Sequence, residues 1–147
     1  MLGHEFCRSG QPPSGRLRAA DETGVAVALG FVLDHPERGA IKMWVVQRVL
    51  NYRRAHAELF AEGDYIPVVV KRPILAYLRR HVNRWVLVLI PLISAEELPA
   101  SGFSVKLPDG APPTRVDRFT GHVHHLSNGM LEWPGWDGFP VAMLVGE

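Results

Sequence analysis

Hydrophobic residues between positions 37 and 62 recur mostly at intervals of three and four, with charged residues at many of the positions between them. This spacing places the apolar side chains on one face of an amphipathic helix. Gly63 follows the last periodic residue, where glycine commonly ends a helix in the left-handed conformation. The pattern therefore predicts one long helix within residues 34–63. Its apolar stripe consists of Ile41, Trp44, Val45, Val49 and Tyr52.

After Gly63 the chain changes to short apolar runs separated by Pro, Gly, Asn and Asp, as is typical of an antiparallel sheet. Residues 85–90 are all apolar, which favours a central strand covered on both faces. Pro67 favours an edge strand or a bulge in the run 65–70. The predicted fold class is mainly β with one long N-terminal helix, the β part being an antiparallel β-sandwich over 64–147. Further strands are expected at 75–82, 103–107, 114–119, 129–133 and 139–145.

The first 33 residues carry two different patterns. Residues 1–23 hold scattered Gly, Pro and Arg with no sustained period, and we expect residues 1–33 as a whole to be disordered or a remnant of a larger unit. The apolar runs 25–33 and 85–93 are each far shorter than the about 20 residues that a membrane-spanning helix needs. Both runs are therefore predicted to be buried parts of a soluble fold, with no membrane segment.

Composition and charge narrow the class of protein. The 147 residues suit one domain with an extra segment. Sixteen Lys and Arg against fifteen Asp and Glu give a formal net charge of +1, so the basic excess typical of a nucleic-acid-binding protein is missing and no nucleic acid is expected as a partner. The single cysteine, Cys7, cannot form an internal disulfide, which fits a cytoplasmic location.

Several short motifs occur in a collinear order. YRRAH at 52–56 and ELFAEGDYIP at 58–67 are followed by RH at 80–81, RWVLV at 84–88, FTG at 119–121 and FPVAML at 139–144. In this order they resemble the junction of barrel and C-terminal domain, and the C-terminal domain itself, in the malto-oligosyltrehalose synthases of the alpha-amylase superfamily (glycoside hydrolase family 13). The first 30-odd residues and the HVHH segment at 122–125 depart from that pattern. The resemblance implies three parts: an unmatched tail at 1–33, the last barrel-type helix at 34–63 and an all-β C-terminal domain at 64–147.

The resemblance also implies a reaction, the conversion of the terminal α-1,4 bond of a malto-oligosaccharide to an α,α-1,1 bond in trehalose biosynthesis. Enzymes of this type use two carboxyl groups at the ends of barrel strands. Only residues 1–36 precede the barrel-type helix here, so we expect a C-terminal fragment that is structural and inactive alone. We assign no catalytic, cofactor-binding or metal-binding residue and expect no cofactor. The expected partner is the catalytic barrel of the parent enzyme or a second copy of the chain, docked on the apolar stripe of the helix.

Two local features leave other functions open. Trp133 and Trp136 flank a Pro-Gly turn, and paired indoles stack on sugar rings, so the alternative function is a free-standing glycan-binding β module that holds a malto-oligosaccharide. The same pair also fits one Trp that caps the core and another that is half exposed. His122, His124 and His125 are interpreted as a solvated loop, with a zinc site as the alternative, although a further ligand is not evident.

Overall fold

The computed structural model describes residues 24–35, 39–94, 97, 101–136 and 138–146 of the chain. Within these residues three helices precede eight strands, and the expectation for residues 1–23 lies outside the described part. None of the helices that the structure describes is long and apolar enough to cross a membrane. The elements are α2 (Val25–Asp34), α3 (Ala40–Ala55), α4 (Ala57–Ala61), β1 (Asp64–Val68), β2 (Ile74–His81), β3 (Arg84–Pro91), β4 (Phe103–Lys106), β5 (Thr114–Asp117), β6 (Val123–Ser127), β7 (Met130–Trp133) and β8 (Ala142–Gly146).

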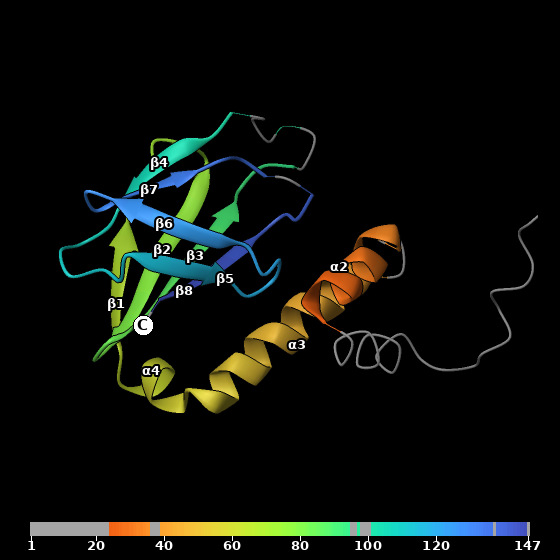
Figure 1. Cartoon of the computed structure of the whole chain (residues 1–147), viewed down its shortest axis with the longest axis horizontal. Helices are drawn as coiled ribbons and strands as arrows, with labels where there is room; N and C mark the ends of the chain where they lie inside the picture. Colours follow the sequence, from red (N-terminus) through yellow and green to blue (C-terminus); the bar gives the residue numbers. More distant parts are fainter. Residues whose placement is uncertain (1–23, 36–38, 95–96, 98–100, 137, 147) are drawn as a thin grey trace, which may run out of the picture.

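The strands form one nearly closed antiparallel sheet in the order β1-β2-β3-β8-β5-β6-β7-β4 (Figure 1). The prediction of a mainly β, antiparallel fold is confirmed, but the strands curl around a common interior as a single sheet. The last strand, β8, lies between β3 and β5, so β3 is central as its apolar sequence predicts. The strand that contains Pro67 is at the edge, where a residue without an N–H donor is tolerated.

The sheet has a hydrophobic core on each face. The interior core is formed by alternate residues of the strands, among them Leu78, Leu87, Val105, Leu131 and Leu144. The outer core lies between the sheet and the helices, where Val86, Phe119 and Met143 meet residues of α2, α3 and α4. This second core explains why β3 is apolar at every position after Arg84: one set of its side chains faces the interior and the other faces the helices.

The prediction of one long N-terminal helix within 34–63 is wrong, because the described residues of this range form two shorter helices, α3 and α4, which follow α2. His56, with φ −133° and ψ 51°, separates the 16-residue α3 from the 5-residue α4. The expectation of disorder is also wrong for residues 25–33, which belong to α2 and bury Ala28 and Val32 in the outer core. Gly63 does not end a helix in the left-handed conformation. A Cβ there would approach the Leu59 carbonyl oxygen to 2.3 Å, so a side chain would not fit.

The apolar stripe of α3 covers the chain's own sheet. Trp44 is fully buried and Tyr52 is 5% exposed, while Ile41, Val45 and Val49 are half-buried against the outer core. The Trp44 indole Nε1 also donates a 3.1 Å hydrogen bond to the Phe119 carbonyl oxygen. The expectation that this stripe is an exposed docking face is therefore corrected, since the sheet satisfies it within the chain. The division of the chain into domains remains a prediction.

Two hairpin turns differ in how well their residues suit them. Asn128 and Gly129 connect β6 to β7 with φ values of 52° and 74°, as a type I′ turn requires, and Asn-Gly is the sequence this turn prefers. Val82 and Asn83 connect β2 to β3, and Val82 has a φ of 53°. A β-branched residue is strained in this region, where glycine is preferred.

Candidate functional site

A pocket of about 520 Å³ lies beside the sheet, where β5, β6 and β7 meet the segment that leads to β8. We call it the Trp pocket, because Trp133 and Trp136 form one of its walls. Their ring centroids are 5.2 Å apart and the rings are tilted by 56°. The other lining side chains include Asp117, Thr120, His122 and His124.

Strand pairing brings the polar and aromatic side chains of this region into one row. Arg115 of β5 is directly opposite His124 of β6, so both side chains project from the same face of the sheet. The His124 ring stacks on Trp133 of β7, with centroids 5.1 Å apart and an angle of 24°. Trp133 is in turn opposite Phe103 of β4. The row therefore crosses four strands on the interior face, and each of its members comes from a different strand.

Asp117 organises the turn at the end of β5. It is 2% exposed, and its Oδ1 accepts hydrogen bonds from the Phe119 N–H (3.1 Å) and the Met143 N–H (3.3 Å). Its Oδ2 accepts a hydrogen bond from the Thr120 hydroxyl at 2.7 Å. Sequence reasoning did not assign this residue a role in the turn, although an Asp with Thr and Gly three and four residues later is a turn signal. The carboxylate holds the turn to β8 and lines the pocket with both oxygens already bonded.

Arg115 is a second buried ionisable residue that the sequence did not single out. Its side chain is fully buried, and Nε, Nη1 and Nη2 have no hydrogen-bond partner among the residues that the structure describes. Burial in the sheet interior lowers the pKa of its guanidinium from 12.5 to about 10. The group therefore stays charged at neutral pH in a place where charge is costly.

The three histidines of the HVHH segment do not converge. β6 covers His124 and His125, and adjacent residues of a strand point to opposite faces. His124 faces the pocket, whereas Nδ1 of His125 is 3.3 Å from the Thr114 hydroxyl. The described residues contain no group of three or more His, Cys, Asp or Glu side chains that could hold a metal ion. The interpretation as a solvated loop is wrong for His124, which lies in a strand and is half-buried against Trp133.

Burial is the main influence on the pKa of His124, which it lowers from the usual value of about 6.5. The Asp117 carboxylate raises this pKa, and the His122 and His125 rings lower it by smaller effects. The net result is a lowered pKa, so the neutral imidazole is favoured beside the indole. A neutral ring presents one N–H donor and one acceptor nitrogen toward its surroundings.

The two tryptophans predicted as glycan contacts do come together in the pocket, but they are not equally accessible. Trp133 is 7% exposed and belongs to the interior core, whereas Trp136 is half-buried. The indole Nε1 atoms of both residues are buried, and no described residue accepts a hydrogen bond from them. Glycan contact by this pair remains a prediction, and Trp136 offers the more accessible ring.

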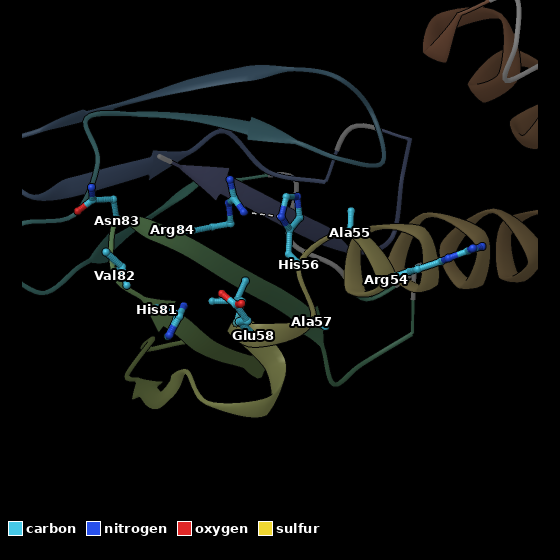
Figure 2. Close-up of a pocket in the computed structure, with 10 residues that line it drawn as sticks. Arg54, Ala55, His56, Ala57, Glu58, His81, Val82, Asn83 and Arg84 are labelled. Carbon is cyan, nitrogen blue, oxygen red and sulfur yellow. Dashed lines mark hydrogen bonds between the residues drawn. The ribbon is translucent and has the colours of Figure 1, made fainter.

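A second pocket, of about 540 Å³, lies between the α3–α4 junction and the β2–β3 hairpin (Figure 2). Nδ1 of His56 receives a hydrogen bond from Nη1 of Arg84, so this nitrogen carries no proton. Glu58 and His81 also line the pocket, while Arg54 extends away along α3 (Figure 2). The polar contacts here hold the helices to the hairpin, and Glu58 is the single carboxylate among the lining residues.

Comparison with known proteins shows that the chain shares its fold with solved structures at low sequence identity. No family model matches the chain, and no curated protein matches it. A solved maltooligosyl trehalose synthase matches 88% of this chain and 15% of its own, with a TM-score of 0.55 and 19% identity. AmyP in complex with maltose matches 74% of this chain and 21% of its own, with a TM-score of 0.53 and 18% identity. A variant of AmyP with maltotriose gives a TM-score of 0.51 at 18% identity, covering 71% of this chain and 20% of that one.

These matches show which fold the chain shares and how large a part of each matched structure corresponds to it. The chain spans about a fifth or less of the length of the three structures named. At identities below 20% they show shared architecture rather than shared activity. The described chain is therefore similar in fold to one part of AmyP and to one part of a maltooligosyl trehalose synthase.

Proposed function

We propose that this chain is the C-terminal part of a malto-oligosyltrehalose synthase-like enzyme and has a structural role there, without catalysing the reaction alone. The observation that carries the proposal is the match to a maltooligosyl trehalose synthase over 88% of this chain but only 15% of that one. The collinear motifs from YRRAH at 52–56 to FPVAML at 139–144 support the same assignment.

The pockets support the absence of catalysis by this chain alone. A retaining glycosidase-type mechanism needs two carboxyl groups about 5–5.5 Å apart. Among the described residues, each of the two pockets is lined by one carboxylate, Asp117 in the Trp pocket and Glu58 in the other. Both oxygens of Asp117 are committed to the turn that follows β5. In this proposal the two carboxyl groups come from another part of the parent enzyme.

The outward side of α3 offers the surface by which the chain would meet the rest of that enzyme. Met43, Val46 and Leu50 are 40%, 46% and 56% exposed, and their spacing of three and four places them in one stripe. This outward stripe lies on a different side of α3 from the buried Trp44 and Tyr52. A barrel that packs on the outward stripe would remove three large apolar side chains from water.

The test uses the chain alone. Incubation with maltopentaose should leave the number of reducing ends unchanged, and their loss would contradict the structural role. The wild-type chain should bind a hydrophobic dye and elute above its monomer mass, because the outward stripe is uncovered. Val46→Lys and Leu50→Lys should reduce both signals. Val69→Lys, at a valine that is 89% exposed outside the helices, is the matched control and should not. A monodisperse monomer without dye binding would contradict docking through α3.

A second candidate function is favoured by the Trp pocket, whose aromatic wall suits the apolar face of a sugar ring. In this proposal the chain binds malto-oligosaccharide through Trp136, with Trp133 as the fixed support behind it. Titration with maltotriose should change the tryptophan fluorescence. Trp136→Ala should abolish that change, and Trp85→Phe, at a buried position outside the lining of the Trp pocket, should preserve it. A titration without change at millimolar maltotriose would rule this candidate out.

A further inference from the structure

The interior of the sheet beside the Trp pocket contains buried hydrogen-bond donors for which no described residue provides an acceptor. They are the three guanidinium nitrogens of Arg115 and the indole Nε1 atoms of Trp133 and Trp136, all shielded from solvent. Among the described residues, the buried side-chain atoms without a partner in this interior are all donors, and none is an acceptor. Buried donors normally find acceptors, so this imbalance points to a missing acceptor group.

These donors belong to one continuous line of side chains. Arg115 is opposite His124, His124 stacks on Trp133 at 5.1 Å, and Trp133 contacts Trp136 at 5.2 Å. The last three residues line the Trp pocket. Arg115 itself does not line the pocket, but it is the strand partner of His124, which does.

The nearby carboxylate does not supply the missing acceptor. Asp117 projects from the same face of β5 as Arg115, but its oxygens bind the Phe119 and Met143 N–H groups and the Thr120 hydroxyl. Arg115 forms no ion pair with any residue that the structure describes, and desolvation lowers the pKa of its guanidinium. Its positive charge is thus uncompensated by a described carboxylate, while Asp117, which lines the pocket, disfavours an anion placed directly beside it.

We propose that the Trp pocket binds a ligand made of a sugar-sized ring with an anionic group, a carboxylate or a phosphate, which accepts hydrogen bonds from Arg115 and the indole N–H groups. The indoles contact the face of the ring, and the guanidinium supplies the matching charge. Because the donors are shielded from solvent, the proposal requires His124, which stacks on Trp133, to move when the ligand enters. This proposal uses the same pocket as the second candidate function above, but the expected ligand is an acidic sugar in place of a neutral one.

The experiment compares three probes that differ in charge. Glucuronate carries a carboxylate, glucose 6-phosphate carries a phosphate, and glucose is the neutral control. Calorimetry should show glucose binding at least tenfold more weakly than the better of the two anions, whose relative affinities show which group the site prefers. In a ¹H–¹⁵N spectrum the indole N–H signals of Trp133 and Trp136, assigned with Trp→Phe variants, should move on binding, because they donate to the anion.

Substitutions of the donor residues test whether Arg115 supplies the positive charge that binds the anion. Arg115→Met replaces the unpaired cation with an apolar chain of similar length, so the fold should be retained and the anion affinity should fall to that of glucose. Arg118→Met, at an exposed arginine three residues further on, is the matched control and should bind as the wild type does. Trp136→Phe keeps a ring but removes one donor, and should weaken anion binding several-fold even if Arg115→Met does not fold.

The possible outcomes separate this inference from the second candidate function. Equal binding of glucose and the two anions would overturn the inference and leave neutral-sugar binding in place. Anion binding that neither Arg115→Met nor Trp136→Phe weakens would overturn it as well. If the three probes and maltotriose all fail to bind, both proposals for the Trp pocket are refuted.

Discussion

Substitution of Asp117 by Ala tests how the turn after β5 is held to β8. The change removes the acceptor for two buried backbone donors, the N–H groups of Phe119 and Met143, and for the Thr120 hydroxyl. A buried donor left without a partner costs about 1–3 kcal/mol. The two N–H groups therefore predict a loss of about 2–6 kcal/mol in the free energy of unfolding, before any contribution from the partly buried hydroxyl. A loss of this size is a large fraction of the stability of a small domain.

Asp117→Asn separates hydrogen bonding from charge. The amide oxygen can still accept from the Phe119 and Met143 N–H groups, and the amide nitrogen can donate to the Thr120 hydroxyl oxygen. We expect a loss of no more than about 1–2 kcal/mol, the difference between charged and neutral hydrogen bonds.

The assay is urea unfolding followed by tryptophan fluorescence and by circular dichroism, with Asp109→Ala at an exposed turn as the control. Asp109→Ala should leave the midpoint close to that of the wild type, since the site is exposed. The two probes should give coincident transitions, which is required before the free energies are compared. If Asp117→Ala unfolds within 1 kcal/mol of the wild type, the turn is not held by the carboxylate and the reasoning is refuted.

Two further predictions concern the hairpin turn and the buried imidazole. Val82→Gly should raise the free energy of unfolding by about 0.5–1 kcal/mol. The reason is that relief of roughly 1–2 kcal/mol of backbone strain at φ 53° exceeds the entropy cost of glycine. Urea unfolding measures this change, and a variant less stable than the wild type would contradict the prediction. The pKa of His124 is lowered in the folded state, so its neutral form is favoured there and stability is complete above about pH 6.5. As the pH falls below 6.5 toward the lowered pKa, the unfolded chain takes up a proton first and stability declines. His124→Phe keeps a ring against Trp133 and should make the melting temperature depend less on pH over this window, and an unchanged pH dependence would contradict the assignment.

Much of the β architecture could be predicted because its signals are local. The run 85–90 is apolar at every position, and it is a strand covered on both faces. Pro67 marked an edge strand, since a residue without an N–H cannot take part fully in a sheet ladder. β6 was missed because the HVHH segment lacks an apolar alternation. The Asn128-Gly129 turn that follows it was a usable hairpin signal that the sequence reading did not weigh.

The helical region shows where periodicity alone misleads. The three- and four-residue spacing continues through His56, and only the observed backbone angles reveal that the helix breaks there. The same spacing predicted an apolar stripe without showing what covers it. The structure covers Trp44 and Tyr52 with the chain's own sheet and leaves Met43, Val46 and Leu50 on the outward side.

From the sequence alone follow the mainly β antiparallel fold, the positions of most strands along the chain, the near balance of charges and the placement of Trp133 and Trp136 on either side of a tight turn. These follow from residue types and from spacings within about ten positions, which a single chain segment can express. The tertiary structure decided that Arg115, His124 and Trp133 form one row, and that Asp117 of β5 holds β8. Such contacts depend on which strands lie side by side. The physical reason is that strand order is set by the packing of the whole sheet and its helices, while each strand's own sequence specifies only which face it buries.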